Sequence, residues 1–301
     1  MKRYGFLRSE FRNSSPESAR YHVIPVPFEA TVSYKGGTSR GPEAILEASY
    51  QLEQTAEGLM EPGIYGMHTT RPVDCQITDS PGEVMGRIAD IMHRSMEMEA
   101  VPILLGGEHS ITNGAIEAIS RRFSPGTAGI LQFDAHMDLR DTYEGSPWSH
   151  ASVMRRAVEA GIPLYQVGVR NFSAEETEAR TQYAVGYTDA SALYRMSRCS
   201  DGYQKLTLPR EFPQHIYISF DVDAFDASLM AATGTPEPGG LFWWDAVELL
   251  SRFIQGRTII GADVVELAPV DSLHHCSYTA AKLTYHLMGL ASPGLFRLPL
   301  L

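Results

Sequence analysis

The chain has 301 residues, of which 44% are hydrophobic, and it carries a formal net charge of −11 at pH 7. A chain of this length can bury a large core, and its negative charge argues against nucleic acid or an anionic membrane surface as a partner. No apolar stretch approaches membrane-spanning length. The three cysteines are far apart, which predicts no disulfide framework and favours a reducing, cytoplasmic location: Cys75, Cys199 and Cys276.

The N-terminal segment, residues 1–19, is polar and charged, so we expect an extension rather than a secretory signal, and one domain over the chain of 1–301. Residues 21–27 predict the first strand. A Gly-rich loop over 33–42 follows and leads into a helix over 43–54. The loop lacks the glycine and lysine spacing of a phosphate-binding loop. We therefore expect it at the rim of an active site or at a subunit contact.

Helical and strand-like patterns then alternate to the C-terminus. This alternation predicts an α/β fold in which helices cover both faces of a parallel sheet. Residues 191–211 are ambiguous. The helices expected after residue 80 are 83–99, 111–123, 151–160, one that Ser173 opens, 242–255 and 277–290, and the strands are 101–105, 130–133, 163–170, 184–188, 215–223 and 258–267.

Residues that can bind metal follow three of the predicted strands. They are His109 after strand 101–105, Asp134, His136 and Asp138 after strand 130–133, and Asp221 and Asp223 at the end of strand 215–223. Residues two apart in a strand face the same side, and open α/β sheets place their sites beyond the carboxyl ends of strands. The side chains of these motifs could therefore converge on one point.

A single motif of this kind often only caps or anchors a loop. Three of them at the ends of three apolar strands are hard to explain as caps, because burying so many carboxylates without cations would be costly. Six ligands also exceed the four that a structural zinc usually takes. Carboxylates with some imidazole suit Mn²⁺, Mg²⁺ or iron, and the number suits a pair of ions.

These motifs carry a resemblance to a known family. Gly-Gly-Glu-His-Ser at 106–110, Asp-Ala-His-Met-Asp at 134–138 and Ser-Phe-Asp-Val-Asp at 219–223 precede Gly-Thr-Pro-Glu-Pro-Gly-Gly at 234–240. In this order they resemble the ureohydrolases, the family of arginases and agmatinases, over residues 25–290. The resemblance implies a three-layer α/β/α sandwich with a mostly parallel central sheet and two Mn²⁺ ions. One ion would be held by His109, Asp134, Asp138 and Asp221, and the other by Asp134, His136, Asp221 and Asp223, so that Asp134 and Asp221 bridge.

The resemblance also implies a mechanism. A hydroxide that bridges the ions would attack a guanidinium carbon while Glu266 holds the guanidinium group, and Asp138 would hydrogen-bond the hydroxide. His150 would deliver a proton to the leaving amine, although a His at a helix start is often only a neighbour of the cap. Asp263 is out of phase with Glu266 and is assigned no role.

The stretch of residues 139–156, with Leu-Arg-Asp-x-Tyr-x-Gly followed by Ser-His-Ala-Ser-Val-Met-Arg-Arg, is more similar to agmatinases than to arginases, and it includes the loop over residues 139–149. Within it, Asp141 and Glu144 could attract a distal ammonium, so Glu144 joins Glu266 and His150 as a candidate substrate-binding residue. We therefore expect agmatine to be cleaved to urea and putrescine, a step of polyamine synthesis. The alternatives are 4-guanidinobutyrate, guanidine or arginine as substrate, or a non-catalytic metal-binding subunit that regulates a partner enzyme. The family forms trimers and hexamers, which implies a homo-oligomer.

Overall fold

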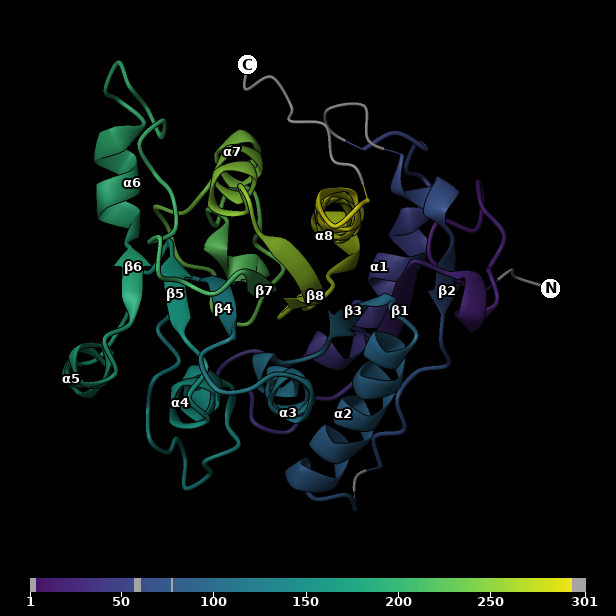
Figure 1. Ribbon diagram of the computed structural model, residues 1–301, viewed down its shortest axis with the longest axis horizontal. Coiled ribbons are helices and arrows are strands. Elements are labelled where there is room, and N and C mark those ends of the chain that lie inside the picture. Colours follow the sequence, from purple (N-terminus) through teal and green to yellow (C-terminus); the bar gives the residue numbers. More distant parts are fainter. Residues whose placement is uncertain (1–3, 57–60, 77, 294–301) are drawn as a thin grey trace.

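The computed structural model describes residues 4–56, 61–76 and 78–293. Within them, parallel strands form one eight-stranded sheet in the order β2-β1-β3-β8-β7-β4-β5-β6 (Figure 1). The strands are β1 Tyr21–Val26, β2 Met67–Thr69, β3 Val101–Gly106, β4 Ala128–Phe133, β5 Leu164–Val167, β6 Gly186–Thr188, β7 His215–Asp221 and β8 Thr258–Val265.

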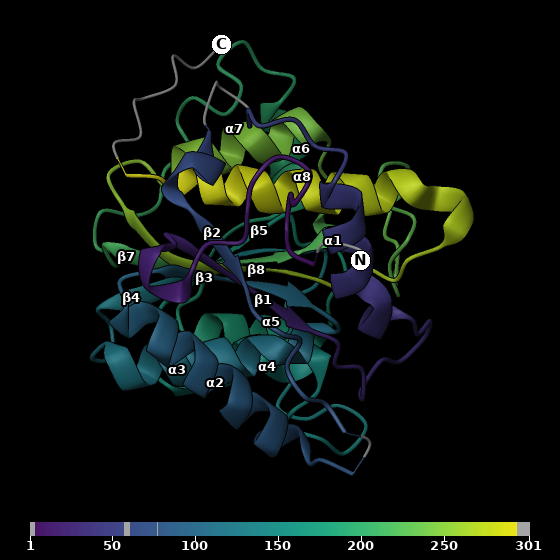
Figure 2. The same ribbon diagram turned by 90° about the vertical axis from the view of Figure 1, so that its right-hand side faces the viewer.

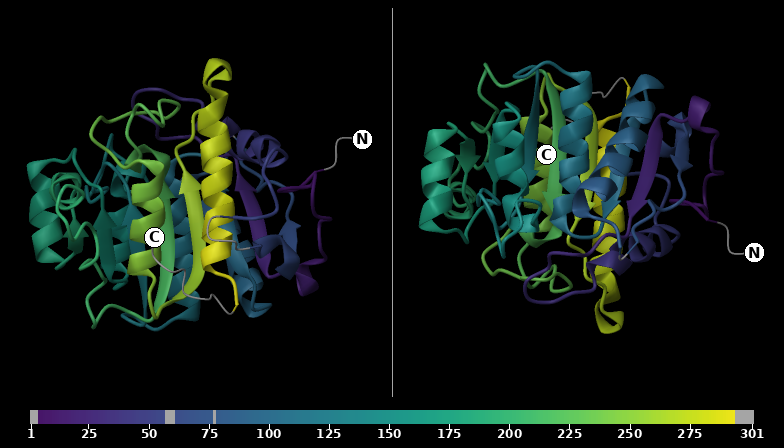
Figure 3. Two further views of the ribbon diagram at one scale, coloured as in Figure 1. Left: turned by 90° about the horizontal axis from the view of Figure 1, so that it is seen from above. Right: turned by 90° about the horizontal axis from the view of Figure 1, so that it is seen from below.

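Helices cover both faces of this sheet. One layer contains α2, α3 and α4, and the opposite layer contains α1, α7 and α8, as Figures 2 and 3 show from different sides. The predicted three-layer α/β/α sandwich is therefore confirmed, with a sheet that is parallel throughout. The helices are α1 Gly41–Ser49, α2 Pro81–Glu97, α3 Thr112–Arg122, α4 Val153–Glu159, α5 Ala174–Gln182, α6 Ala190–Met196, α7 Trp243–Phe253 and α8 His274–Leu290.

The central strands are apolar on both faces because both faces are covered by helices. On β3, Ile103 and Leu105 pack into the cluster beneath α1, α7 and α8, whereas Leu104 packs into the cluster on the side of α2 and α3. Phe133 of β4 and Phe220 of β7 stack with ring centroids 5.1 Å apart. This alternation explains why the sequence shows continuous apolar runs at these strands rather than a polar face.

Four features differ from the sequence-based expectations. The predicted polar extension over residues 1–19 does not describe Phe6 and Leu7, which are buried in the core, where their backbone N–H groups donate to Thr69 Oγ1 and Ser49 Oγ. The short strand β2 has too few residues for a periodic signal, and α6 lies in the stretch that the pattern left ambiguous. Helix α8 begins at His274, so His274 and His275, which precede the predicted helix over 277–290, lie in its first turn.

The sheet topology places the predicted metal motifs together. Because the strands β3, β8, β7 and β4 are neighbours and run parallel, their carboxyl ends lie at one edge in the middle of the sheet. Among the described residues, no helix combines the length and apolarity needed to cross a membrane. All three cysteines are free thiols in the described part of the chain.

Candidate metal centre

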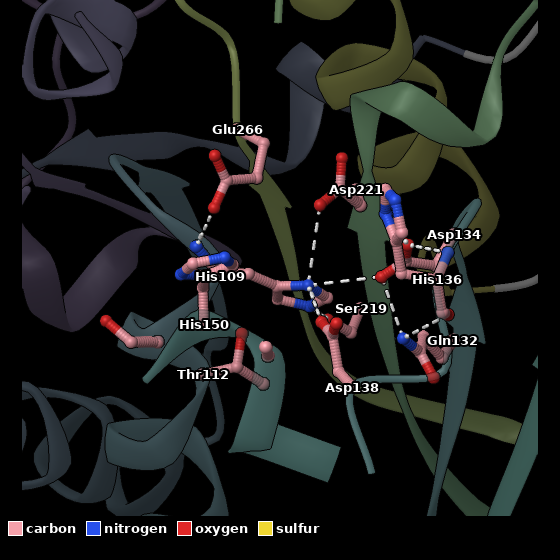
Figure 4. A network of polar contacts seen from close by, with 12 residues as sticks. His109, Thr112, Gln132, Asp134, His136, Asp138, His150, Ser219, Asp221 and Glu266 are labelled. Atoms are coloured by element: carbon pink, nitrogen blue, oxygen red, sulfur yellow. Dashed lines mark hydrogen bonds and ion pairs between the residues drawn. The ribbon is translucent and has the colours of Figure 1, made fainter. Parts of the chain in front are cut away.

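The three motifs meet at this edge of the sheet (Figure 4). The Nδ1 atom of His109 lies 2.9 Å from a carboxylate oxygen of Asp138, 3.2 Å from one of Asp134 and 3.5 Å from one of Asp221. All four side chains are buried. Residues from the ends of β3, β4 and β7 thus bring one imidazole and three carboxylates to a single point.

The Asp-Ala-His-Met-Asp motif converges for a different reason from strand alternation. Strand β4 ends at Phe133, and the backbone bends at Ala135 so that His136 N donates to Asp134 Oδ1 over 2.6 Å. Asp138 adopts a left-handed backbone with φ 54°, which is uncommon for a residue other than glycine. Its carbonyl accepts hydrogen bonds from the N–H groups of Met154 and Arg155 at the start of α4, and these hold the turn.

The Gly-Gly-Glu-His-Ser turn aims His109 at the carboxylates. A Cβ atom at Gly107 would lie 1.9 Å from the carbonyl oxygen of Phe28, so only glycine fits at this close approach. The Nε2 atom of His109 lies 2.8 Å from Ser219 Oγ, which itself donates to Asp263 Oδ1 over 2.9 Å. Since Ser219 gives its one proton to Asp263, it accepts from Nε2–H of His109.

This tautomer leaves the lone pair of Nδ1 facing three carboxylates. Nδ1 of His109 is buried and has no hydrogen-bond partner with acceptable geometry among the described residues. A lone pair that points at carboxylate oxygens is stable only when a positive charge lies between them, either a proton or a metal cation. The donor set and this orphan atom therefore fit a cation.

A second potential ligand group adjoins the first. Asp134, His136 and Asp223 place ligand atoms within 4.8 Å of one another, and His109, Asp134 and Asp221 do the same. His136 Nδ1 lies 3.1 Å from Asp223 Oδ2 and 3.5 Å from Asp134 Oδ1. Asp134 belongs to both groups, which is the arrangement expected of a carboxylate shared by two ions.

The pKa shifts within the cluster also indicate that it fits a cation. Burial raises the pKa of Asp138 to about 7, with a further contribution from Asp134. Burial, Asp223 and Asp134 raise the pKa of Asp221 well above its usual value. Burial acts to lower the pKa of His109, but the neighbouring carboxylates of Asp134, Asp138 and Asp221 raise it well above the usual value. The cluster therefore holds too little positive charge for its carboxylates to ionise together unless cations bind.

A row of buried polar side chains supports the ligands, and sequence reasoning missed it. Gln166, Gln132, Ser219 and Asp263 pair in register on four neighbouring strands and are each 0% exposed. Gln132 Nε2 donates to Asp134 Oδ2 over 2.7 Å, and Gln166 Nε2 donates to Gln132 Oε1 over 2.6 Å. Asp263, to which we assigned no role, also accepts from Thr112 Oγ1 over 2.8 Å. The available signal was a polar residue inside each of four apolar strands.

A cavity of about 240 Å³ opens above the cluster, and both Glu266 and His150 line it. Glu266 follows β8 in a left-handed conformation with φ 65°, and its Oε1 accepts from the N–H of His109 over 2.5 Å. Burial raises the pKa of Glu266 to about 8. Burial also lowers the pKa of His150, which favours the neutral imidazole. The part of the Gly-rich loop around Tyr34 lines the same cavity. This position agrees with the expectation that the loop lies at the rim of a site rather than only at a subunit contact.

The two acidic residues of the 139–149 loop, Asp141 and Glu144, do not line this cavity. Glu144 is exposed at a turn with φ 49° and is not among the residues that line the cavity, and Asp141 pairs with Arg156 at 3.0 Å. The cavity wall near this loop instead contains Arg140, whose guanidinium group lies over the ring of Tyr143. The role of Glu144 in substrate binding stays a prediction, as do the individual roles of the ligands, Glu266 and His150.

Comparisons with known proteins agree with this geometry. The model of the Arginase family matches residues 19–289. The chain is 36% identical to an N(1)-aminopropylagmatine ureohydrolase of Synechocystis over 94% of its length and 92% of the relative, and 33% identical to an agmatinase of Pyrococcus horikoshii over 92% and 93%. The crystal structure of agmatine ureohydrolase of Thermoplasma volcanium aligns with a TM-score of 0.77 at 28% identity, covering 95% of this chain and 96% of that one.

Proposed function

Because the chain belongs to the arginase family of ureohydrolases, we propose that it hydrolyses the guanidinium group of agmatine to urea and putrescine at a pair of Mn²⁺ ions. The observation that carries this proposal is the two ligand groups that share Asp134 at the base of a cavity lined by Glu266 and His150. A metal-binding regulatory subunit would not need a carboxylate and a histidine in the cavity wall.

The residues that would hold the ions are those of the two groups together with Asp138, whose carboxylate lies 2.9 Å from His109 Nδ1. Manganese suits this set because hard carboxylate oxygens predominate over imidazole nitrogens. When bound, the cations supply one chemical function, which is to acidify a water molecule so that it becomes a strong nucleophile at neutral pH.

The protein groups then bind and orient the substrate. A planar guanidinium group can pair with both oxygens of a carboxylate, and Glu266 presents a nine-tenths buried carboxylate to the cavity. Its pKa is raised by burial to about 8, so the arrival of a cationic guanidinium favours the ionised form. Substrate binding and ionisation of Glu266 therefore reinforce each other.

His150 would supply the proton that the leaving amine requires. It lies on the cavity wall at the first residue of a 3-10 turn that precedes α4. A neutral imidazole that accepts a proton from solvent and passes it to the departing nitrogen is the usual role of histidine in such a reaction. We expect His150→Ala to lower the turnover number by about 10²-fold or more while two ions stay bound, which metal analysis and steady-state kinetics would measure. Unchanged turnover would remove His150 from the mechanism.

A second candidate substrate is N(1)-aminopropylagmatine, because the relative from Synechocystis carries that name. This compound has the same guanidinium end as agmatine and a longer cationic tail, so the chemistry at the metal centre would be unchanged. Lys35 and Arg140 on the cavity wall are reasons to test a substrate with a distal carboxylate as well.

The experiment is urea release by the purified, Mn²⁺-loaded protein with a panel of substrates run in parallel: agmatine, N(1)-aminopropylagmatine, 4-guanidinobutyrate, arginine and guanidine. A kcat/KM for agmatine that exceeds all others supports the proposal. A higher value for N(1)-aminopropylagmatine replaces the substrate and keeps the reaction. Release of no urea from any of them, with two ions bound, would refute the catalytic proposal in favour of a regulatory subunit. Mass measurement in solution tests the expected homo-oligomer.

A further inference from the structure

Glu108, the residue before His109, is fully buried and fixes a neighbouring loop. Its Oε2 accepts from the N–H groups of Ala30 and Thr31 over 2.7 and 2.6 Å. Its Oε1 accepts from the hydroxyl of Thr31 over 2.8 Å and from the hydroxyl of Ser110. A carboxylate surrounded by four donors can only accept, so the Thr31 hydroxyl proton points at Glu108.

The remaining hydrogen-bonding capacity of Thr31 is used by His150. Thr31 Oγ1 accepts from the backbone N–H of His150 over 3.1 Å and lies 3.2 Å from its Nδ1. A hydroxyl has one proton and two lone pairs, and the proton is already given to Glu108. The second lone pair of Thr31 therefore faces Nδ1 of His150 and requires a proton there.

We propose that Glu108 and Thr31 are positioning residues for His150, which they hold with Nδ1 protonated and Nε2 as the nitrogen that exchanges protons in the cavity. The Ser149 hydroxyl is a weaker partner for Nδ1, because it lies 3.4 Å away, farther than Thr31 Oγ1 at 3.2 Å. The His150 ring packs against the Tyr143 ring in a T-shaped arrangement, with centroids 5.8 Å apart, which limits rotation of the imidazole. Within the described part of the chain, Nε2 of His150 has no protein hydrogen-bond partner.

The hydrogen bond from Nδ1–H of His150 to Thr31 is kept in both protonation states of the imidazole. In the imidazolium form, His150 keeps Nδ1–H on Thr31 and breaks the Nε2–H bond as the departing nitrogen of the substrate gains that proton. The product is neutral His150 with Nδ1 still protonated, so no rearrangement of Thr31 or Glu108 is needed between turnovers. This consequence rests on the proposed function, whereas the tautomer itself does not.

The isosteric substitution Glu108→Gln gives a direct test. The two backbone N–H groups at Oε2 can only donate, so the carbonyl oxygen of glutamine must take that place and its NH₂ group must face the Thr31 hydroxyl. Thr31 then accepts from Gln, and its proton turns to Nδ1 of His150. The variant is expected to convert neutral His150 from the Nδ1–H to the Nε2–H tautomer.

Nitrogen-15 NMR of the full-length protein, labelled at histidine and loaded with diamagnetic Mg²⁺, reports the tautomer of each ring. The His150 signals are identified by their loss in His150→Gln. The wild-type protein should show Nδ1–H at His150, and Glu108→Gln should show Nε2–H. An Nε2–H tautomer in the wild type, or no change in Glu108→Gln, would overturn the proposal whether or not the protein hydrolyses agmatine.

Kinetics separate positioning from a general structural role. Thr31→Val removes the hydroxyl at constant size and is expected to lower kcat about tenfold, part of the roughly 10²–10⁴-fold that a general acid supplies, with little change in KM. Thr31→Ser should restore kcat. Thr38→Val is the matched control, because the buried Thr38 hydroxyl donates to Glu29 over 3.2 Å in the Gly-rich loop and does not contact His150.

A substrate with a better leaving group sharpens this test. In the guanidinooxy analogue of agmatine, the departing alkoxyamine is far less basic than an alkylamine and needs less help from an acid. Thr31→Val should therefore lower turnover of the analogue less than turnover of agmatine. Equal losses on both substrates, or a loss in Thr38→Val as large as that in Thr31→Val, would show that Thr31 only maintains the loop.

Discussion

Two buried histidines of this chain hydrogen-bond a serine hydroxyl at the same distance, yet their surroundings differ. His109 Nε2 lies 2.8 Å from Ser219 Oγ, and His22 Nδ1 lies 2.8 Å from Ser95 Oγ. The other nitrogen of His22 lies 2.9 Å from the carbonyl oxygen of Pro16, whereas the other nitrogen of His109 faces three carboxylates without an acceptable hydrogen bond. Both ring nitrogens of His22 therefore have hydrogen-bond partners within the protein, whereas Nδ1 of His109 has none among the described residues.

The difference shows that the groups facing the free nitrogen of a buried histidine determine whether it can bind a metal ion. His22 lies on β1, near the edge of the sheet, where its neighbours are a hydroxyl, a carbonyl and the ring of His68, 5.5 Å away between centroids. Burial lowers the pKa of His22, and the Pro16 carbonyl and Glu17 offset this effect only in part. At His109 the carboxylates reverse that effect, and a cation can replace the proton.

The largest effect should come from removing the carboxylate that both ligand groups share. Asp134→Ala is expected to lose both ions and all turnover, because each group of ligands loses a member. Metal analysis after gel filtration measures the loss. Asp141→Ala, at the exposed partner of Arg156 in the following loop, should retain two ions. Two ions in Asp134→Ala would refute its shared role.

Asp221→Ala sharpens the same comparison. Its carboxylate lies 3.5 Å from His109 Nδ1 and belongs to one of the two geometric ligand groups, whereas the resemblance to ureohydrolases implies that it bridges both ions. A bridging residue predicts that both ions are lost, and a residue of one site predicts that one ion remains. Isothermal titration with Mn²⁺ would distinguish a protein with one site from a protein with none.

A smaller effect on metal binding is expected from deleting the Ser219 hydroxyl, which orients His109. Ser219→Ala leaves Nε2–H of His109 without an acceptor, and loss of such a support typically costs about 10–100-fold in metal affinity. Ser95→Ala removes the equivalent hydroxyl from His22 and should leave Mn²⁺ affinity unchanged. Direct Mn²⁺ titration of both variants makes the comparison. Equal affinities in the two variants would mean that the Ser219 hydrogen bond does not prepare His109 for the metal.

The sequence predicted the cluster of candidate ligands better than the residues that surround it. Asp134, His136 and Asp138 could be identified as candidates because metal-binding residue types follow an apolar strand and match a family motif. Their convergence, however, arises from a turn with a left-handed Asp138, which strand periodicity does not encode. Ser219 and Asp263 are single polar residues within apolar strands, and only the register of β7 with β8 shows that they face each other.

The substrate end of the cavity was less predictable for a similar reason. Glu144 belongs to a loop whose composition suggested attraction of an ammonium group, but loop composition does not determine which side chains turn inward. In the structure Glu144 is exposed, while Arg140 and Lys35 contribute to the cavity wall. The fold was predictable because its signal is repeated at every strand and helix, whereas the inward-facing residues of one loop have no such repetition.

The smallest expected effect is the loss of stability when His22, the histidine with hydrogen bonds at both ring nitrogens, is replaced. His22→Leu should leave both ions bound and reduce the free energy of unfolding at pH 7.5 by about 1–3 kcal/mol, because Ser95 Oγ and Pro16 O lose a buried partner. Burial lowers the pKa of His22 below its usual 6.5 in the folded protein, so below pH 6.5 the unfolded chain binds a proton that the folded protein does not. The wild type therefore loses this part of its stability as the pH falls, and the leucine variant does not.

Urea unfolding at pH 7.5 and 5.5 should show a smaller gap in the free energy of unfolding between the two proteins at the lower pH. A gap that widens toward acid pH would mean that folded His22 binds a proton more readily than the unfolded chain, and the contrast with His109 would fail.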